Sequence, residues 1–208
     1  MVLKLKQLEV EQKLKSLGLV VFTPAEFKDI FGVSLATARS YIKRNIVHGL
    51  FIKLRNNFYQ LSDSSPSLYE IANRLYQPSY ISLEKALSHY HIIPETVYTI
   101  TSISTKPTRE FVNPRGTFSY QQIKKSTFTG YSSRQIEGVL VLMAEPAKAL
   151  ADYLYFVDLK KISLNDRLEI SSIKKSELVK YAKLFDRPGM LTLIEKIYVE
   201  STKPRTIR

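Results

Sequence analysis

The stretch from residue 23 to residue 61 constrains the fold more than any other part of the chain, because helix start and stop signals follow one another closely in it. Thr23 is followed by Pro24 at the first helical position and by Glu26 three residues after the cap, which is the pattern of a capping box. Gly32 then supplies the left-handed conformation at which helices commonly end. A short helix is therefore predicted between Thr23 and Gly32.

A second helix is predicted to begin after the cap residue Ser34 and to end before Gly49. Apolar residues recur on it at the spacing of one helical stripe, which predicts the face that packs on the core. These predicted core positions are Leu35, Ala38, Ile42 and Ile46. A helix, a turn and a second helix are thus expected in this order.

The other side of the second helix combines small polar residues with cations, and no acidic residue occurs from Ser34 to Ser62. Such side chains are what a helix needs to contact base edges and phosphates in a major groove. The helix residues expected to contact DNA are Ser34, Ala36, Thr37, Arg39, Ser40, Tyr41, Lys43 and Arg44. Those expected to face the groove are Thr37, Ser40, Tyr41 and Arg44, and those expected to approach phosphates are Ser34, Arg39 and Lys43.

The pair Asn56-Asn57 predicts a two-residue hairpin turn, since asparagine tolerates the positive φ of a type I′ turn. Pairing of Arg55 with Phe58 then fixes the register. The expected inner face carries Ile52, Leu54, Tyr59 and Leu61, and the expected outer face carries Lys53, Arg55, Phe58 and Gln60. As a basic wing, the hairpin is expected to contact DNA through Lys53, Arg55 and Asn56. The alternative is an ordinary helical hairpin with a solvated basic surface.

The composition favours a polyanionic partner. The 208 residues carry a formal net charge of +12, and the pI is near 9.7. The absence of cysteine excludes disulfides, thiol nucleophiles and cysteine-containing zinc fingers. The first residues alternate apolar with charged side chains, and no apolar run approaches a membrane span. A cytoplasmic protein without membrane contact is therefore expected.

An amphipathic helix over residues 2–17 is expected to complete a bundle with the two helices already described. Its expected apolar positions are Leu3, Leu8, Val10, Leu14 and Leu17. Residues 19–22 are expected to add a short strand to the hairpin. The turn-forming run SDSSPS marks a domain boundary. We therefore expect a winged helix-turn-helix domain over residues 1–62, a linker over 63–67 and a second domain over 68–208.

The second domain is expected to pack helices on an antiparallel sheet, which makes the whole chain α+β. Its helices are predicted over Leu68 to Tyr76, after the cap Ser82, and from Pro146, Ser176 and Pro188. Between residues 96 and 144 the period changes from helical to alternating, which predicts about four or five strands. Residues 139–143 are apolar at every position and are predicted to form a central strand covered on both faces.

Two motifs of the second domain resemble a known family. Residues 101–111 read TSISTKPTREF, and residues 146–155 read PAKALADYLY. Together with the N-terminal pattern, they resemble the AbiEi antitoxins and transcriptional regulators of type IV toxin-antitoxin systems, over most of the chain to about Phe156. The sequence departs from that family at Ala147, where glutamate is common, and at Ala151, where leucine is common.

The resemblance implies an N-terminal winged helix that represses its own operon by binding inverted repeats in the promoter, so double-stranded DNA is one partner. It also implies a C-terminal domain that counteracts a toxin of the nucleotidyltransferase type, in an abortive infection system that defends against phage. Whether that toxin touches this chain stays open. The alternative is a stand-alone winged-helix regulator, or a protein- or RNA-binding module without an antitoxin role.

Lys106 and Arg109 lie beside hydroxyl residues at a predicted strand turn, which suits them to hold an anion or to contact a partner. The alternative is that Arg109 pairs with Glu110 or Asp152 and joins the sheet to a helix. Asp152 is otherwise expected to be a structural acceptor, and Glu145 a charge at a helix N-terminus.

No enzyme is expected from these residues. Glu145 and Lys148 do not have the spacing of a nuclease motif, and neither glycine-rich phosphate loops nor a G-x-S-x-G motif occur. His89 and His91 are two residues apart, which would place them on different sides of a helix and disfavours a metal site. We therefore expect no catalytic residue, metal or cofactor.

Overall fold

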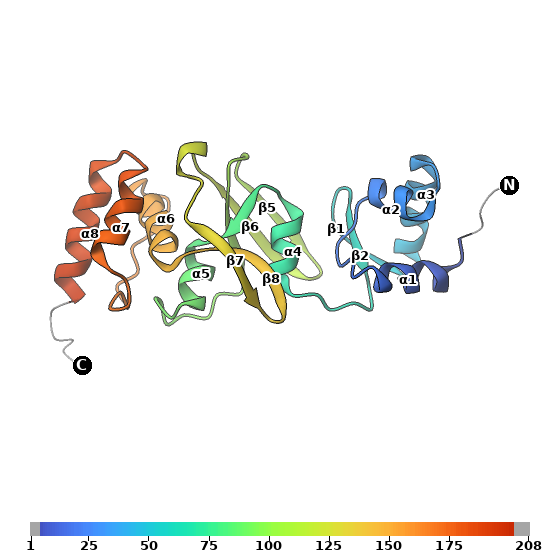
Figure 1. Ribbon diagram of the computed structural model, residues 1–208, viewed down its shortest axis with the longest axis horizontal. Helices are drawn as coiled ribbons and strands as arrows, with labels where there is room; N and C mark the ends of the chain where they lie inside the picture. Colours follow the sequence, from blue (N-terminus) through green and yellow to red (C-terminus); the bar gives the residue numbers. More distant parts are fainter. Residues whose placement is uncertain (1–4, 202–208) are drawn as a thin grey trace.

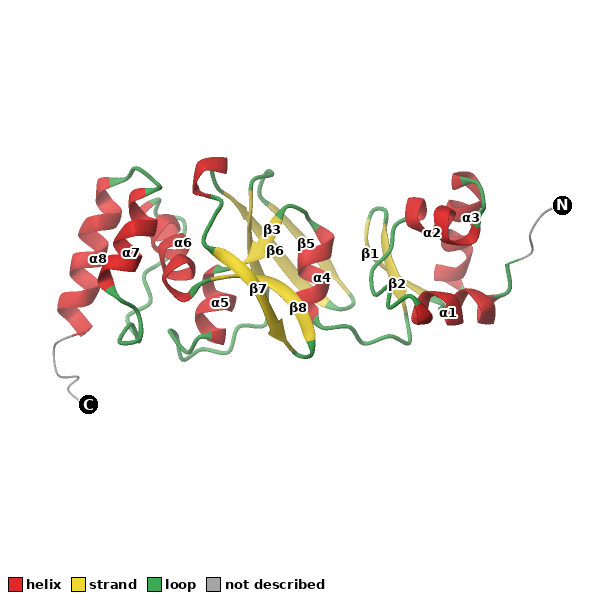
Figure 2. Cartoon of the chain, viewed as in Figure 1, coloured by secondary structure: helices red, strands yellow, loops and turns green. Residues whose placement is uncertain are grey.

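The computed structural model describes residues 5–201, which form eight α-helices, a short 3-10 helix, a two-stranded sheet and a six-stranded sheet. This is an α+β fold, as predicted. The molecule is elongated: helices and the small sheet form the N-terminal end, the large sheet lies in the middle, and helices close the C-terminal end (Figure 1). The two sheets are separate in the view coloured by secondary structure (Figure 2).

The N-terminal helices α1 (Gln7–Ser16), α2 (Pro24–Phe31) and α3 (Leu35–Val47) share a small core with the small sheet. The predicted capping box of α2 is present, because Thr23 accepts a hydrogen bond from the backbone N–H of Glu26 and its own N–H donates to the Glu26 carboxylate. Gly32 ends α2 with φ of 62°. The local signals therefore placed both ends of this helix correctly.

The apolar side of α1 differs from the prediction. Val10 and Leu14 are buried at a spacing of four residues, but Leu8 is 64% exposed and Leu17 is 50% exposed. Leu8 lies off the stripe that Val10 and Leu14 define, and Leu17 is already the C-cap. Leu3 lies outside the described residues.

The small sheet consists of β1 (Phe51–Arg55) and β2 (Phe58–Leu61), and Arg55 pairs with Phe58 as predicted. Lys53 pairs with Tyr59, so Leu54 is an extra residue in β1 and forms a bulge. The bulge moves side chains to the other face, and Gln60, predicted to face outward, is fully buried. The predicted strand over residues 19–22 is reduced to a single bridge between Phe22 and Tyr59.

Both faces of the hairpin are covered. Phe51 and Leu61 pack in the small core with the N-terminal helices. Leu54 belongs to the large core of the rest of the molecule, and Ile52 and Phe58 pack against that core. The hairpin therefore lies between the two cores instead of projecting into solvent.

The large sheet contains six strands in the order β5-β6-β4-β3-β8-β7. The strands are β3 (Ser79–Ile81), β4 (Ile100–Ser104), β5 (Arg109–Asn113), β6 (Gly116–Gln122), β7 (Tyr131–Ile136) and β8 (Val139–Ala144). The pairs β3–β8 and β4–β6 are parallel, so the sheet is mixed and the predicted antiparallel sheet is wrong. Strand β3 was not predicted, because only three residues lie between Pro78 and the predicted helix cap Ser82.

Strand β8 is not the central strand that its apolar sequence predicts. It lies between β3 and the edge strand β7, and Leu140 is 72% exposed and Leu142 is 40% exposed, whereas Val141 and Met143 are buried. Next to the single bridge between Ile81 of β3 and Met143 of β8, the side chain of Asn73 bonds the backbone of β8. Its Oδ1 accepts from the N–H of Leu142 at 2.5 Å, and its Nδ2 donates to the Leu142 carbonyl oxygen at 3.2 Å.

The remaining helices cover the large sheet and extend beyond its far end (Figure 1). They are α4 (Leu68–Leu75), α5 (Leu83–His89), α6 (Pro146–Asp158), α7 (Lys175–Lys183) and α8 (Pro188–Ser201), and a 3-10 turn spans Lys125–Thr127. Their starts agree with the predicted ones within a residue.

A fully buried ion pair lies inside α6. Asp152 accepts hydrogen bonds from Lys148, from the Tyr80 hydroxyl at 3.0 Å and from the Ser82 hydroxyl at 2.8 Å. The structural role predicted for Asp152 is confirmed. Ser82 stands at the N-cap of α5, but its side chain bonds Asp152 instead of capping the helix.

Candidate nucleic-acid interface

The orientation of α3 follows from its buried stripe, which is Ala38, Tyr41, Ile42 and Asn45. This stripe has the spacing of one helix face, and it is rotated from the predicted one. Leu35 is partly exposed at the edge of the stripe, and Ile46 is half-buried. The choice between the two stripes decides which side of α3 meets solvent.

Tyr41 was expected to face a DNA groove, and the structure corrects this. Its side chain is only 5% exposed, and its ring stacks on Phe27 with a centroid separation of 5.4 Å. The Tyr41 hydroxyl is buried, forms no hydrogen bond within the described part of the chain, and has a pKa raised by that burial. Tyr41 therefore supports the position of α3 from inside the small core.

The other predicted helix residues remain on the surface. Ser34, Ala36, Thr37, Arg39, Ser40, Lys43 and Arg44 are all exposed. Within residues 5–201, no carboxylate forms an ion pair with Arg39, Lys43 or Arg44. Arg44 contacts only the edge of the core, with its guanidinium carbon 5.6 Å from the centroid of the Tyr41 ring. This face is therefore positive and uncompensated.

The first turn of α3 adds hydroxyls to the same face. Ser34 Oγ accepts a hydrogen bond of 3.1 Å from the N–H of Thr37, and the two hydroxyl oxygens lie 2.9 Å apart. No acidic residue occurs in this turn, so the positive end of the helix dipole is not neutralised. Exposed hydroxyls and a helix N-terminus are suited to phosphate oxygens.

The hairpin residues divide into two groups. Lys53 and Asn56 are exposed, as a wing requires. Arg55, however, donates from Nε to the carbonyl oxygen of Leu75 at 2.7 Å, and its guanidinium carbon lies 3.7 Å from the centroid of the Phe58 ring. Burial lowers the pKa of Arg55. The expectation that Arg55 projects to DNA is therefore corrected: it joins the hairpin to α4.

Lys106 and Arg109 are exposed, as an anion or partner contact requires. Arg109 pairs with neither Glu110 nor Asp152, and the alternative interpretation is wrong because Lys148 already neutralises Asp152 inside the protein. The ammonium nitrogen of Lys106 lies 5.5 Å from the centroid of the Tyr76 ring. Glu145 is the N-cap of α6, as expected, and accepts a hydrogen bond of 2.7 Å from the Tyr181 hydroxyl.

Two residues outside the predicted set hold the hairpin in place. Asn113 donates from Nδ2 to the Leu54 carbonyl oxygen at 3.2 Å, and Arg115 donates to the carbonyl oxygens of Ser62 and Ser64. Both lie at the turn between β5 and β6. The sequence signalled a turn there through Pro114 and Gly116, but it carried no signal of what the turn would contact.

Across residues 5–201, no group of three or more histidine or carboxylate side chains is placed to hold a metal ion. No helix in this part of the chain has both the length and the apolar character needed to cross a bilayer.

Comparisons with known proteins assign no family to the chain. No protein-family model matches the sequence, and no curated protein matches it. Inferences about its function therefore rest on the geometry of α3 and on the two motifs of the second domain.

Proposed function

We propose that the chain is a DNA-binding transcriptional repressor whose N-terminal segment acts as a winged helix-turn-helix unit. The observation that carries this proposal is the exposed face of α3, where Arg39, Lys43 and Arg44 have no carboxylate partner in the described chain. A helix with such a face neutralises phosphates when it enters a major groove, and its small side chains allow close approach to base edges.

The roles of the side chains follow from their spacing on α3. Thr37, Ser40 and Arg44 lie on one stripe and read base edges, with Arg44 placed to bind a guanine through two hydrogen bonds. Arg39 and Lys43 flank this stripe and contact phosphates, together with the hydroxyl of Ser34 at the helix start. Lys53 and Asn56 add a limited wing contact, because the rest of the hairpin lies between the two cores.

The wider role proposed is that of a cytoplasmic AbiEi-type antitoxin. The support is the resemblance of residues 101–111 and 146–155 to that family. In this role the chain represses its own operon by binding inverted repeats in the promoter, and the second domain counteracts a nucleotidyltransferase toxin.

The DNA-binding proposal is tested by selection from a pool of random duplexes, followed by fluorescence anisotropy with the selected site. We expect a consensus with two-fold symmetric half-sites. Arg44→Ala should weaken binding to it by about 1–3 kcal/mol. The matched control is Lys180→Ala, which removes an exposed cation from α7 at the other end of the molecule. Binding without any consensus, or equal effects of the two variants, would contradict specific recognition by α3.

The antitoxin role needs a separate experiment, because a repressor need not neutralise a toxin. A reading frame adjacent to this one that encodes a nucleotidyltransferase should arrest growth when expressed alone. Co-expression of the full chain should restore growth, and Arg44→Ala should restore it equally well if the second domain suffices. If no such reading frame exists, or the chain gives no protection, the protein is a stand-alone regulator.

A further inference from the structure

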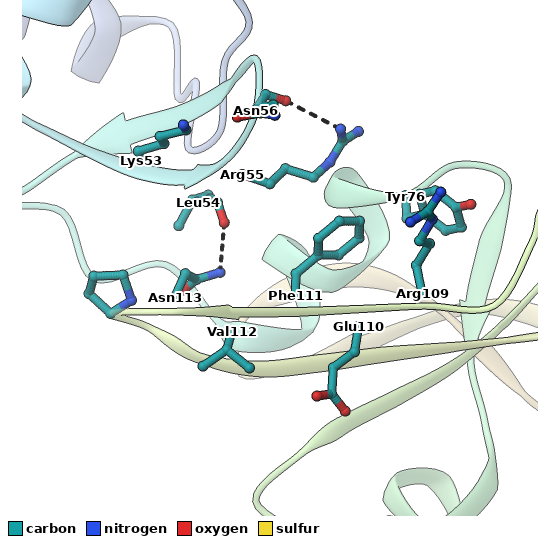
Figure 3. Close-up of a pocket in the computed structure, with 11 residues that line it drawn as sticks. Lys53, Leu54, Arg55, Asn56, Tyr76, Arg109, Glu110, Phe111, Val112 and Asn113 are labelled. Atoms are coloured by element: carbon teal, nitrogen blue, oxygen red, sulfur yellow. Dashed lines mark hydrogen bonds between the residues drawn. The ribbon is translucent and has the colours of Figure 1, made fainter.

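A cleft of about 610 Å³ lies between the tip of the hairpin and strand β5. One wall is formed by Lys53, Arg55 and Asn56, and the opposite wall comes from β5, with Tyr76 at one end (Figure 3). Its volume is within the range of small-molecule sites, which is about 300–1,000 Å³. The hairpin face that lines the cleft is not the one that packs on α3.

Side chains alternate between the two sides of β5, and this alternation determines which groups face the cleft. Arg109, Phe111 and Asn113 point toward the hairpin, whereas Glu110 and Val112 point to the other side of the strand (Figure 3). Glu110, the only carboxylate among the described residues that line the cleft, therefore extends away from it. The cleft side holds guanidinium groups, an ammonium group, side-chain amides and the rings of Phe111 and Tyr76.

The cations of the cleft have no counter-charge within the described chain. Neither Lys53, Arg55 nor Arg109 forms an ion pair with a carboxylate of residues 5–201. Arg55 bonds two backbone carbonyl oxygens, of Leu75 and Asn56, through Nε and Nη1, and no bond of Nη2 is formed within these residues. An anion bound in the cleft would supply the counter-charge that these cations lack within the described chain.

We propose that this cleft binds a nucleotide, with its phosphates on Lys53, Arg55 and Arg109 and its base against the apolar wall. Guanidinium groups bind phosphate oxygens through paired hydrogen bonds, and the free Nη2 of Arg55 is available for this. The base lies along the exposed parts of Phe111 and Tyr76, and the amide of Asn56 contacts its polar edge. The ligand bridges the hairpin and β5, and so fixes the N-terminal unit on the large sheet.

The proposal does not depend on DNA binding by α3, because no residue of α3 lines the cleft. Lys53 and Asn56 belong to both the cleft and the proposed wing contact, whereas Arg109 belongs to the cleft alone. It is tested by isothermal titration calorimetry of the full chain with the mono-, di- and triphosphates of adenosine and guanosine. The partial ligands are the two nucleosides and inorganic pyrophosphate. We expect saturable binding of at least one nucleotide, and binding of its nucleoside and of pyrophosphate weaker by about tenfold or more, because each lacks one half of the contacts.

The variants Lys53→Gln and Arg109→Gln should each weaken nucleotide binding by about tenfold, which corresponds to a lost charge-assisted hydrogen bond. Both side chains are exposed and form no hydrogen bond in the described chain, so the variants keep the fold. Lys180→Gln on α7 is the matched control and should bind as the parent does. Arg44→Ala should also bind the nucleotide normally, which separates this site from the proposed DNA interface.

Two outcomes overturn the proposal. The first is no saturable binding of any of the six nucleotides. The second is nucleotide binding that the Lys53→Gln, Arg109→Gln double variant retains. If, in that second case, Arg109→Gln alone weakens binding to the duplex, the cleft cations are contacts for a DNA backbone.

Discussion

Arg55, at the end of β1, donates a hydrogen bond from Nε to the carbonyl oxygen of Leu75, the last residue of α4. This bond joins segments that the sequence assigns to different domains. The contacts of Asn113 with Leu54 and of Arg115 with Ser62 act at the same junction. The helix proposed to bind DNA is therefore carried on a unit that is attached to the large sheet through its own hairpin.

The first prediction concerns this attachment. Arg55→Ala should lower the free energy of unfolding by about 1–3 kcal/mol, because it leaves the Leu75 carbonyl oxygen without its charged donor. Urea unfolding at neutral pH measures the change. Lys53→Ala on the same strand should change stability by less than about 0.5 kcal/mol, since the Lys53 side chain is exposed. Equal losses of stability for both variants would show that the hydrogen bond from Arg55 to Leu75 does not stabilise the attachment.

The second prediction concerns the salt dependence of DNA binding. If Arg39, Lys43 and the wing residue Lys53 neutralise phosphates, the slope of log affinity against log salt should be about −3 for one copy of the chain and about −5 for two copies on an inverted repeat. Fluorescence anisotropy over a salt series gives this slope. Lys43→Gln should reduce its magnitude by about 1 per copy. An affinity that does not change with salt concentration would contradict the proposed phosphate contacts.

The third prediction concerns the buried pair of Lys148 and Asp152. Lys148→Met should lower stability by about 3–5 kcal/mol, because it leaves a buried carboxylate unpaired. The double variant Lys148→Met, Asp152→Leu should recover most of this loss, as both charges are then removed. Chemical unfolding of the three proteins forms the test. A double variant as unstable as the single one would mean that the loss of stability comes from disturbed packing around α6 and not from an unpaired charge.

The same single variant should show a stronger dependence of stability on pH than the parent protein. Burial raises the pKa of Asp152, and Lys148 is the main group that opposes this rise. Without Lys148 the pKa of the folded carboxyl rises further above its unfolded value, so the contribution of Asp152 to stability is greatest at low pH and is lost as pH rises through the folded pKa. Lys148→Met should therefore be closer to the parent protein in stability at pH near 5 than at pH near 7. A gap that does not change with pH would contradict this.

The fourth prediction concerns Tyr181. Burial and its hydrogen bond to Glu145 raise the pKa of the Tyr181 hydroxyl to about 12, from an ordinary value of 10.0. The stabilisation is present below the unfolded pKa and is lost as pH rises toward the folded one. The stability advantage of the parent over Tyr181→Phe should therefore shrink between these two values. Paired unfolding curves across this range test it, with tyrosinate absorbance as a direct readout of the ionisation.

The sequence predicted local structure well wherever a short signal determined it. The capping box at Thr23, the glycine at the end of α2 and the Asn56-Asn57 turn all act within a few residues. The pairing of β4 with β6 depends instead on contacts between distant segments, and alternation alone does not distinguish parallel from antiparallel neighbours. No local sequence signal predicted the bulge at Leu54. The bulge moved side chains such as Gln60 to the opposite face of the hairpin from the predicted one.

The buried face of α3, which determines the side of the helix that meets solvent, was also predicted only in part. Ala38 and Ile42 belong both to the predicted buried stripe of α3 and to the observed one. Tyr41 and Asn45 complete the observed stripe because the Tyr41 ring fits against Phe27, whereas Leu35 stays partly exposed. A tyrosine suits either a core or a surface, so its position depends on the packing partner that the fold supplies.

The amide of Asn73 takes the place of a neighbouring strand inside the large sheet. It occupies the N–H and the carbonyl group of Leu142, next to the single bridge that joins β8 to β3. Backbone groups of an interior strand need a partner, and β3 is too short to supply one along the whole of β8. One side chain of α4 therefore completes the hydrogen bonding of β8 and ties this helix to the sheet.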